Sequence, residues 1–378
     1  MLRVLTLSTL FSDATRPRFG GFVARQTADL AALPDTQVTV VAPIGLPPWP
    51  LTRLSRYAAL AALPRDERWD GLEVHRPRFT TLPGTGGRFH AAALARAIAP
   101  LVERIAPDVI DAEFFFPDGV AAAALGRRLG IPMSIKARGS DVHHWGRARA
   151  TAGQVRAAAH AADGLLAVSA AMADDMVALG LPRPRIHYTG VDLARFTPAD
   201  RTAAKATFGV SGPLVVSAGT LDDNKGHAIV IDAIARLPGV TLLIAGEGPN
   251  RAALERQVAP LGERVRLLGS TPHDALARLL AAADAFALAS AREGLANVWV
   301  EALASGTPLV ITDAGGAREV VTAPVYGRVV ARTPDAFAHA LAKILADPPA
   351  PGAVRAGAER FSWAENARSL RAHLAALV

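Results

Sequence analysis

Short apolar runs alternate with amphipathic stretches along most of the chain. In the second half, apolar runs of four or five residues predict buried strands at Leu214 to Ala218, Thr241 to Ala245, Val265 to Leu268, Ala285 to Leu288 and Pro308 to Ile311. Segments of helical length separate these runs. This alternation is typical of a parallel sheet that is covered by helices on both faces. The pattern therefore predicts an α/β fold for this half.

The first half shows the same alternation less regularly. Strands are predicted at Val4 to Ser8, Gln37 to Ala42, Val109 to Ile110, Ile131 to Lys136, Gly164 to Ser169 and Arg185 to Tyr188. The segment Ile44 to Trp69 departs from the pattern, because it is apolar, aromatic and basic at once. It is interpreted in two ways, as a contact with a membrane surface or a lipid acceptor, or as a helix packed on its own domain.

Composition sets limits on the class of protein. A length of 378 residues suggests two domains of ordinary size. The absence of cysteine excludes disulfides, a thiolate zinc site and a cysteine nucleophile. The first ten residues resemble a strand more than a signal peptide, and no apolar run has transmembrane length. We expect a cytoplasmic protein, with contact to the inner face of the plasma membrane as an open alternative.

The positive charge lies mostly in the first half. Residues 1–190 hold 22 Lys and Arg against 16 Asp and Glu, so this half carries +6 of the net +7. An anionic partner is expected, either a lipid-phosphate acceptor or an anionic membrane surface. The alternative is an arginine-rich composition without such a partner. Nucleic acid is not expected, because no basic run or nucleic-acid motif is present.

The richest chemistry lies between Ser290 and Glu319. A polar loop ends at Gly294, a helix is predicted from Asn297 to Ala304, and Gly315-Gly316 forms a later turn. A helix N-terminus offers unpaired N–H groups that suit a phosphate, and Asn297 is the expected N-cap.

Two carboxylates flank the start of this helix, Glu293 before it and Glu301 inside it. Carboxylates repel phosphate but accept hydrogen bonds from sugar hydroxyls. One interpretation is that backbone N–H groups seat a diphosphate, with one glutamate for the sugar on each side. From spacing alone, two solvated glutamates of an ordinary α/β protein are an equally good interpretation.

The pattern Glu-Gly-x-x-Asn-Val-x-x-Glu-Ala-x-Ala-x-Gly-x-Pro, followed by Gly-Gly-x-x-Glu, resembles the signature of the retaining glycosyltransferases of family 4. The resemblance implies a GT-B fold, α/β with two doubly wound Rossmann-like domains whose parallel sheets face each other across a cleft. The expected domains are 1–190 for the acceptor and 191–360 for the nucleotide-sugar donor. The remaining segment, 361–378, is expected to pack back on the first domain.

By this resemblance, Glu293 binds donor-sugar hydroxyls and Glu301 the ribose. Lys225, just before a helix, faces the diphosphate, and backbone N–H groups near it stabilise the leaving charge. The remaining expected donor contacts are Gly294, Leu295, Ala296, Asn297, Gly315, Gly316, Thr220, Gly21, Arg138 and, beside the nucleotide base, Gly269.

The sequence departs from the family at two positions. Thr220 stands where an arginine is frequent, so Arg138 or Arg292 is the candidate to replace its charge. Glu113 stands where members commonly have a histidine near the reacting carbon. Glu113 is a candidate for catalysis, and His143 or His144, in the segment after Arg138, is a candidate to supply the imidazole. The alternative is that these histidines only form hydrogen bonds within a loop.

The expected reaction moves a sugar from a nucleotide diphosphate such as UDP, GDP or dTDP to a hydroxyl of a glycan or lipid-linked acceptor, with retention. No cofactor or metal is expected. Three alternatives remain: a non-catalytic subunit that binds nucleotide sugars, a GT-B epimerase or phosphorylase, and a two-domain protein that binds free sugars.

Overall fold

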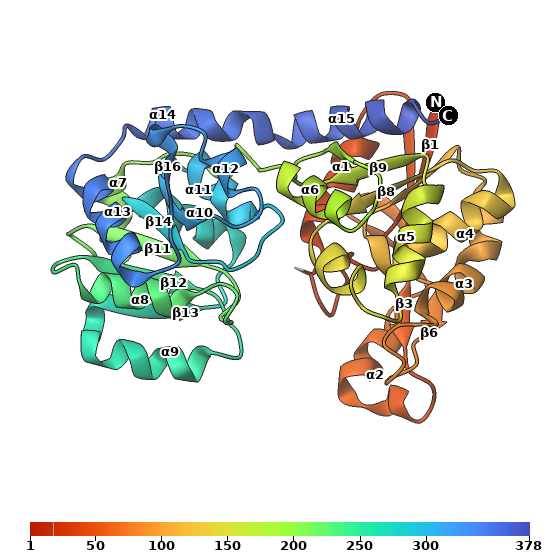
Figure 1. The fold of residues 1–378 in the computed structure, drawn as a ribbon, viewed down its shortest axis with the longest axis horizontal. Coiled ribbons are helices and arrows are strands. Elements are labelled where there is room, and N and C mark those ends of the chain that lie inside the picture. Colours follow the sequence, from red (N-terminus) through yellow and green to blue (C-terminus); the bar gives the residue numbers. More distant parts are fainter. Residues whose placement is uncertain (18) are drawn as a thin grey trace. The chain divides into compact units, whose positions relative to one another are not determined.

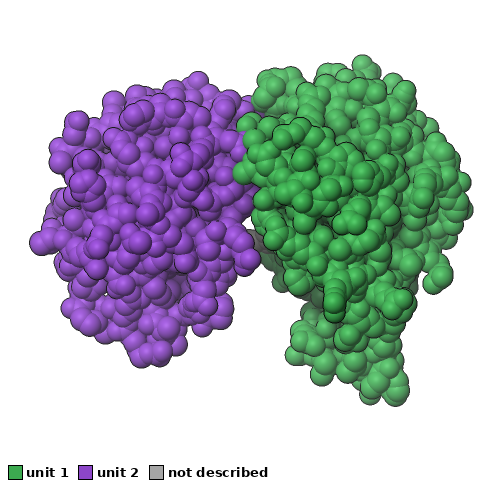
Figure 2. Space-filling model, viewed as in Figure 1, with its two compact units in different colours: residues 1–189, 363–378 green, residues 190–362 purple. Residues whose placement is uncertain are grey.

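The computed structural model describes residues 1–17 and 19–378, which form two compact units (Figures 1 and 2). Unit 1 comprises residues 1–189 and 363–378, and unit 2 comprises residues 190–362. The chain passes from one unit to the other after Thr189, one residue before the boundary expected from the sequence.

The core of unit 1 is an eight-stranded sheet with strand order β10-β9-β8-β7-β1-β2-β5-β4. All neighbours pair in parallel except β4 and β5, which are antiparallel at one edge. The strands are β1 (Leu2–Leu7), β2 (Thr36–Val41), β4 (Asp66–Trp69), β5 (Leu72–His75), β7 (Val109–Ala112), β8 (Met133–Ala137), β9 (Gly164–Ala167) and β10 (Arg185–Ile186).

Helices pack against this sheet through apolar faces, as the alternation predicts. Leu94, Ile98 and Val102 of α3 recur at helical spacing and are fully buried. The helices are α1 (Gly21–Ala31), α2 (Ser55–Ala62), α3 (His90–Ile105), α4 (Val120–Leu129), α5 (Ala152–Ala161), α6 (Ala170–Ala178) and α15 (Trp363–Ala375), with the π-helices η2 (Phe115–Gly119) and η3 (Asp141–Trp145).

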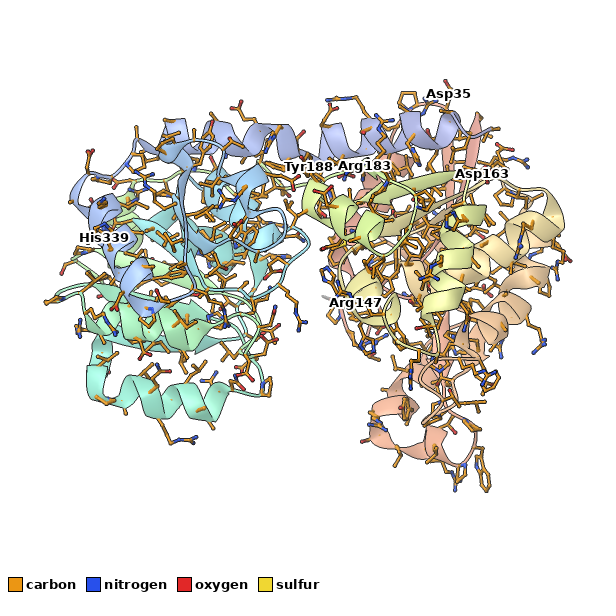
Figure 3. All side chains as sticks on the ribbon, viewed as in Figure 1. Asp35, Arg147, Asp163, Arg183, Tyr188 and His339 are labelled. Carbon is orange, nitrogen blue, oxygen red and sulfur yellow. The ribbon has the colours of Figure 1, made fainter. Side chains whose placement is uncertain are left out.

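The last helix, α15, belongs to unit 1 and packs on α1. Leu370 and Leu374 of α15 join the apolar cluster that includes Val4 of β1. Asn366 Nδ2 donates a hydrogen bond of 2.6 Å to the carbonyl of Tyr188, which Figure 3 labels. The end of the chain is thus fixed to the first unit by both apolar and polar contacts.

The unusual segment after β2 forms a small lobe with its own structure. The strands β3 (Ile44–Leu46) and β6 (Arg78–Thr80) form a separate parallel pair. The short 3₁₀ helix η1 (Leu51–Arg53) and α2 follow β3. The residue pattern did not predict β3, β4, β5 or β6.

Unit 2 is a second doubly wound domain. Its six strands pair in parallel in the order β13-β12-β11-β14-β15-β16. They are β11 (Leu214–Ala218), β12 (Thr241–Ala245), β13 (Val265–Gly269), β14 (Ala285–Leu288), β15 (Leu309–Thr312) and β16 (Gly327–Val330). Every residue of β11 and β14 is buried, as a parallel sheet covered on both faces requires.

The helices of unit 2 alternate with these strands. They are α7 (Arg201–Ala206), α8 (His227–Ala235), α9 (Arg251–Val258), α10 (His273–Ala282), α11 (Asn297–Ala304), α12 (Ala317–Val320), α13 (Pro334–Ala346) and α14 (Pro351–Arg355), with 3₁₀ helices η4 (Ala259–Arg264), η5 (Pro324–Tyr326) and η6 (Ala356–Phe361). The predicted α/β class and the two parallel-sheet domains are confirmed.

Candidate active site

Lys225 and Glu293 form an ion pair in unit 2. Lys225 Nζ lies 2.5 Å from Glu293 Oε1, and the side chains are 20% and 10% exposed. Lys225 follows β11 and Glu293 follows β14, which are neighbouring parallel strands. Their loops therefore leave the sheet at the same edge, which is where doubly wound sheets bind ligands. The pair is shielded from bulk water but accessible to a ligand.

Two polar residues that the sequence did not single out hold this pair in place. Asn224 Oδ1 accepts the N–H of Arg292 at 3.1 Å, and Asn224 Nδ2 donates to the carbonyl of Arg292 at 3.0 Å. Asp222 Oδ1 accepts the N–H of Lys225 at 2.9 Å. The run Asp222 to Asn224 could have indicated this role in the sequence, because Asp and Asn side chains often form hydrogen bonds with nearby backbone groups in turns.

The glycine turn after β15 packs directly on the Glu293 loop. The N–H of Gly316 donates to the carbonyl of Gly294 at 2.8 Å. Gly315 has φ of +52°, and a Cβ added there would lie 2.2 Å from the carbonyl oxygen of Glu293. Only glycine permits this approach. The structure thus brings Glu293, Gly294, Gly315 and Gly316 together, as the sequence suggested.

Helix α11 begins beside this turn without a side-chain cap. Ala296 occupies the N-cap position and Asn297 is the first helical residue, so the expected N-cap role of Asn297 is wrong. Leu295 and Ala296 are buried. Because no side chain caps the helix, its first N–H groups are left for a ligand or solvent.

Glu301 lies in the second turn of α11 and is partly buried. Its backbone carbonyl accepts the hydroxyl of Ser305 at 2.9 Å, while its carboxylate has neither a hydrogen-bond nor an ion-pair partner among the described residues. Burial raises the pKa of its carboxyl to about 7, and the charge of Arg195 opposes the rise. Glu301 therefore carries an unused acceptor whose charge changes near neutral pH.

Two further predicted donor residues lie at strand ends of unit 2. Thr220 follows β11 and is exposed, and its carbonyl accepts the N–H of Asp222 at 2.9 Å. Gly269 ends β13 in the left-handed region, with φ of +75°, and its carbonyl accepts the N–H of Gly246 at 2.9 Å. Both lie at the ligand-binding edge of the sheet.

In unit 1, Glu113 lies at the centre of a buried charge cluster. It is 0% exposed, and Oε1 accepts bonds from Gln26 at 2.5 Å and Lys136 at 3.0 Å, while Oε2 pairs with Arg138. Burial would raise its pKa, but the charges of Arg138 and Lys136 hold it well below the usual range. A catalytic contact would need an accessible carboxylate, whereas the carboxylate of Glu113 is buried and already bonds to Gln26, Lys136 and Arg138.

Arg138 is similarly committed to its own unit. Its Nε donates to the carbonyl of Glu113 at 2.9 Å, and its guanidinium lies 4.7 Å from the ring centroid of Phe22. The side chain is 7% exposed. Asp111, next to this cluster, is fully buried and has a pKa well above its usual range, because of burial first and the charge of Glu113 second.

His143 lies in η3, and its Nε2 is 2.8 Å from Asp175 Oδ2 on α6. Its side chain is 20% exposed. Glu113 and His143 thus have different partners and belong to separate groups of contacts.

Gly20 and Gly21 at the start of α1 differ in what surrounds them. Gly20 has φ of +67°, and a Cβ there would lie 2.3 Å from the carbonyl oxygen of Leu10. At Gly21 the nearest atom to an added Cβ is Ser12 Oγ at 4.0 Å. Packing therefore requires glycine at position 20 but leaves open space at position 21.

Another buried carboxyl, Asp118, lies near the mouth of the unit 1 sheet. Its Oδ2 accepts the N–H and the hydroxyl of Thr9 at 2.8 and 3.1 Å, while Oδ1 has no partner among the described residues. Burial raises its pKa to about 8, and the bonds from Thr9 oppose this rise. At neutral pH it is largely protonated.

Within the described part of the chain, no three His, Asp or Glu side chains are grouped as metal ligands. None of the described helices has the length and apolar character needed to cross a membrane.

Comparison with known proteins gives a consistent family. Residues 23–195 match the family described as Glycosyltransferase Family 4, and residues 200–369 match glycosyl transferases group 1. TuaC of Bacillus subtilis, a glycosyltransferase assigned to teichuronic acid biosynthesis, is 26% identical over 90% of this chain and 89% of its own length. The GDP-mannose-dependent alpha-mannosyltransferase of Mycobacterium tuberculosis is 31% identical over 71% of this chain and 74% of its own length.

Solved structures share the fold. HepE of Anabaena in complex with UDP superposes with a TM-score of 0.77 at 22% identity, over 100% of both chains. Sucrose-phosphate synthase from Thermosynechococcus elongatus gives 0.79 at 19% identity, over 98% of both chains. The predicted GT-B fold is therefore confirmed, and with the mannosyltransferase 31% identical over 74% of its length, this chain belongs to the family 4 glycosyltransferases.

Proposed function

We propose that this glycosyltransferase moves a sugar from a nucleotide diphosphate sugar to an acceptor hydroxyl with retention at the anomeric carbon. The observation that carries the proposal is the Lys225–Glu293 pair, which lies at the ligand-binding edge of unit 2. Around it lie two features suited to a diphosphate, the close Gly315-Gly316 turn and the uncapped start of α11.

The donor is proposed to bind through unit 2. Lys225 and the N–H groups from Gly294 to Asn297 and of Gly315 neutralise the diphosphate, which must accept more charge as it leaves, whereas the N–H of Gly316 already bonds to Gly294. Glu293 accepts hydrogen bonds from hydroxyls of the transferred sugar, and its contact with Lys225 orients both side chains. Glu301 accepts from the ribose hydroxyls, since its carboxylate is partnerless in the described chain.

The proposed reaction occurs on one face of the sugar. The bond between the anomeric carbon and the phosphate oxygen breaks, and the acceptor oxygen forms the new bond on the same face. The acceptor's hydroxyl proton passes to the departing phosphate oxygen. This route needs no covalent enzyme nucleophile and no metal or cofactor, because Lys225 and backbone dipoles supply the stabilising charge.

Gly21 and the Glu113 cluster are given separate roles in unit 1. The open space at Gly21 permits a ligand to approach the backbone. We assign Glu113 as a positioning residue that fixes Arg138, because its carboxylate has no solvent exposure. Neither Arg138 nor His143 needs to contact the reacting atoms in this scheme.

Relatives point to the substrate classes. HepE was crystallised with UDP and with UDP-glucose, and the Mycobacterium tuberculosis relative is named for GDP-mannose. TuaC is assigned to a cell-envelope polymer. We therefore propose a UDP- or GDP-sugar donor, with dTDP-sugars as the third class, and an envelope glycan or lipid-linked acceptor on the cytoplasmic side of the membrane.

The experiment is a donor screen with the purified chain. Nucleotide release and product formation are followed with UDP-, GDP- and dTDP-sugars, and the anomeric configuration of the product is read by NMR. Glu293→Ala should lose turnover, while Glu255→Gln, an exposed change on α9, should keep it. Binding without release or transfer would favour a non-catalytic subunit, and an inverted product would refute the retaining route.

A further inference from the structure

The lobe of residues 44–65 in unit 1, formed by β3, η1 and α2, exposes an unusual amount of apolar surface. Trp49, Leu51 and Leu54 are 75%, 42% and 47% exposed. Away from the two chain ends, Trp49 is the most exposed large hydrophobic residue of the described chain. Figure 1 shows α2 at the end of this lobe, which projects from the body of unit 1 in Figure 2.

Helix α2 continues the same surface. None of its eight residues is buried, and Ala58, Ala59, Ala61 and Ala62 are exposed. A helix this short is marginal by itself and normally needs a buried apolar face. The methyl groups that would supply such a face point to solvent here, so the lobe lacks a covering surface within unit 1.

The charge of the lobe has a single sign. Residues 44–65 include Arg53, Arg56 and Arg65 and no Asp or Glu. All three arginines are exposed, and none forms an ion pair with a described residue. The nearest acids in the sequence are already committed, since Asp66 lies 2.6 Å from His75 and Glu67 pairs with Arg76.

The lobe is also held in a defined position. The guanidinium of Arg78, on β6, donates to the carbonyls of Ala61 and Leu63 at the end of α2. β3 and β6 pair from Ile44 with Arg78 to Leu46 with Thr80. β3 and β6 are parallel, so the segments that follow them begin at the same end of the pair. The segment after β3 holds Trp49, and the segment after β6 holds Leu82, which is 38% exposed.

We propose that this lobe docks unit 1 on an anionic lipid bilayer. Trp, Leu and Ala side chains enter the interfacial region, while Arg53, Arg56 and Arg65 face anionic headgroups. A protein partner would gain the apolar contact, but it would need an acidic surface to match three unpaired arginines. A bilayer rich in phosphatidylglycerol supplies both over a broad area.

The test is flotation of the full-length chain with vesicles. Binding should occur with phosphatidylglycerol mixed into phosphatidylcholine, should be absent with phosphatidylcholine alone, and should fall with salt above about 0.1 M. Arg53→Gln with Arg56→Gln should weaken partitioning about fivefold for each charge removed. Trp49→Ser with Leu54→Ser should weaken it at least as much.

Matched controls lie in unit 2. Arg318→Gln removes a side chain that is 73% exposed, and Leu268→Ser changes a residue that is 39% exposed. Both controls should bind vesicles like the unchanged chain, and thermal unfolding should show that all variants are folded. Transfer to a water-soluble acceptor should be unaffected by the lobe variants, so docking and the proposed function can fail independently.

A second readout reports on the tryptophan itself. Lipids brominated near the interface should quench part of the fluorescence of the chain, and Trp49→Phe should remove that quenching. Failure to bind anionic vesicles would overturn the proposal, and so would equal losses in the controls. Self-association that the lobe variants abolish, measured by light scattering without lipid, would assign the surface to a second copy of the chain instead.

Discussion

Donor affinity should depend on pH through Glu301. Burial raises the pKa of this carboxyl to about 7, above the value of about 4.3 for an unperturbed glutamate. Binding to ribose hydroxyls needs the ionised form, because a protonated carboxyl loses part of its acceptor capacity. With a pKa near 7, roughly one site in ten is ionised at pH 6 and nine in ten at pH 8. Affinity should therefore rise about tenfold between these values.

The assay is calorimetry with an intact nucleotide sugar. Its diphosphate is esterified at both ends, so it does not titrate in this range, whereas a free nucleoside diphosphate would. Glu301→Gln should bind about tenfold more weakly than the unchanged chain at pH 8, since a charge-assisted hydrogen bond contributes about 1.5–3 kcal/mol. The variant should also show no dependence on pH between 6 and 8.

The free energy of unfolding of the ligand-free chain should change with pH in the direction opposite to donor affinity. A carboxyl whose folded pKa is raised stabilises the fold least when it is ionised, so stability should fall as pH rises from about 4 to 7. Glu301→Gln should make this fall smaller and leave the part that Asp118 contributes, while Glu255→Gln should retain the whole fall. Equal affinity of Glu301→Gln and the unchanged chain at pH 8, with parallel pH profiles, would refute the ribose role.

Four further outcomes are expected. Glu293→Ala should lower kcat by about 10²-fold or more with a smaller effect on folding, as steady-state kinetics and urea unfolding would show. Gly20→Ala should destabilise unit 1 by about 1–2 kcal/mol or more, because Gly20 has a positive φ. Gly21→Ala should keep the stability of the unchanged chain in urea unfolding but lose activity. A stable, fully active Gly21→Ala would remove that residue from the site. Glu113→Gln should destabilise the chain by about 3–5 kcal/mol, since it leaves buried cations uncompensated, and retained stability would contradict the cluster. Asp118, with a folded pKa of about 8, should make stability fall from about pH 4 to 8, and Asp118→Asn should flatten that profile in urea titrations at several pH values.

The predictability of the fold varies with how deeply each strand is buried. β11, β12 and β14 have the bounds predicted from apolar runs, because both faces of these strands are covered. β4 was missed because Asp66–Trp69 is half-exposed at a sheet edge and carries three charges in four residues. Such a strand is defined by its antiparallel partner β5, and a local pattern does not contain that information.

The residues proposed to bind the donor could be named one by one from the sequence, but their contacts could not. Lys225 and Glu293 are 68 residues apart in sequence, and only the pairing of β11 with β14 brings their loops together. The N-cap assignment of Asn297 failed because propensity describes an average helix start. Here the chain enters α11 from buried Leu295 and Ala296, which places the cap one residue earlier.

The site residues of unit 1 were less predictable because its unusual residues compensate one another. A glutamate at position 113 is unfavourable in a buried site unless cations accompany it, and Lys136 and Arg138 come from the adjacent strand β8 and its end. Considered alone, Glu113 suggested a substitute for a catalytic histidine. Considered with its partners, it is one member of a buried set whose charges must be kept or replaced together. The departure at Glu113 is therefore better explained by the internal electrostatics of unit 1 than by a change in the chemistry of transfer.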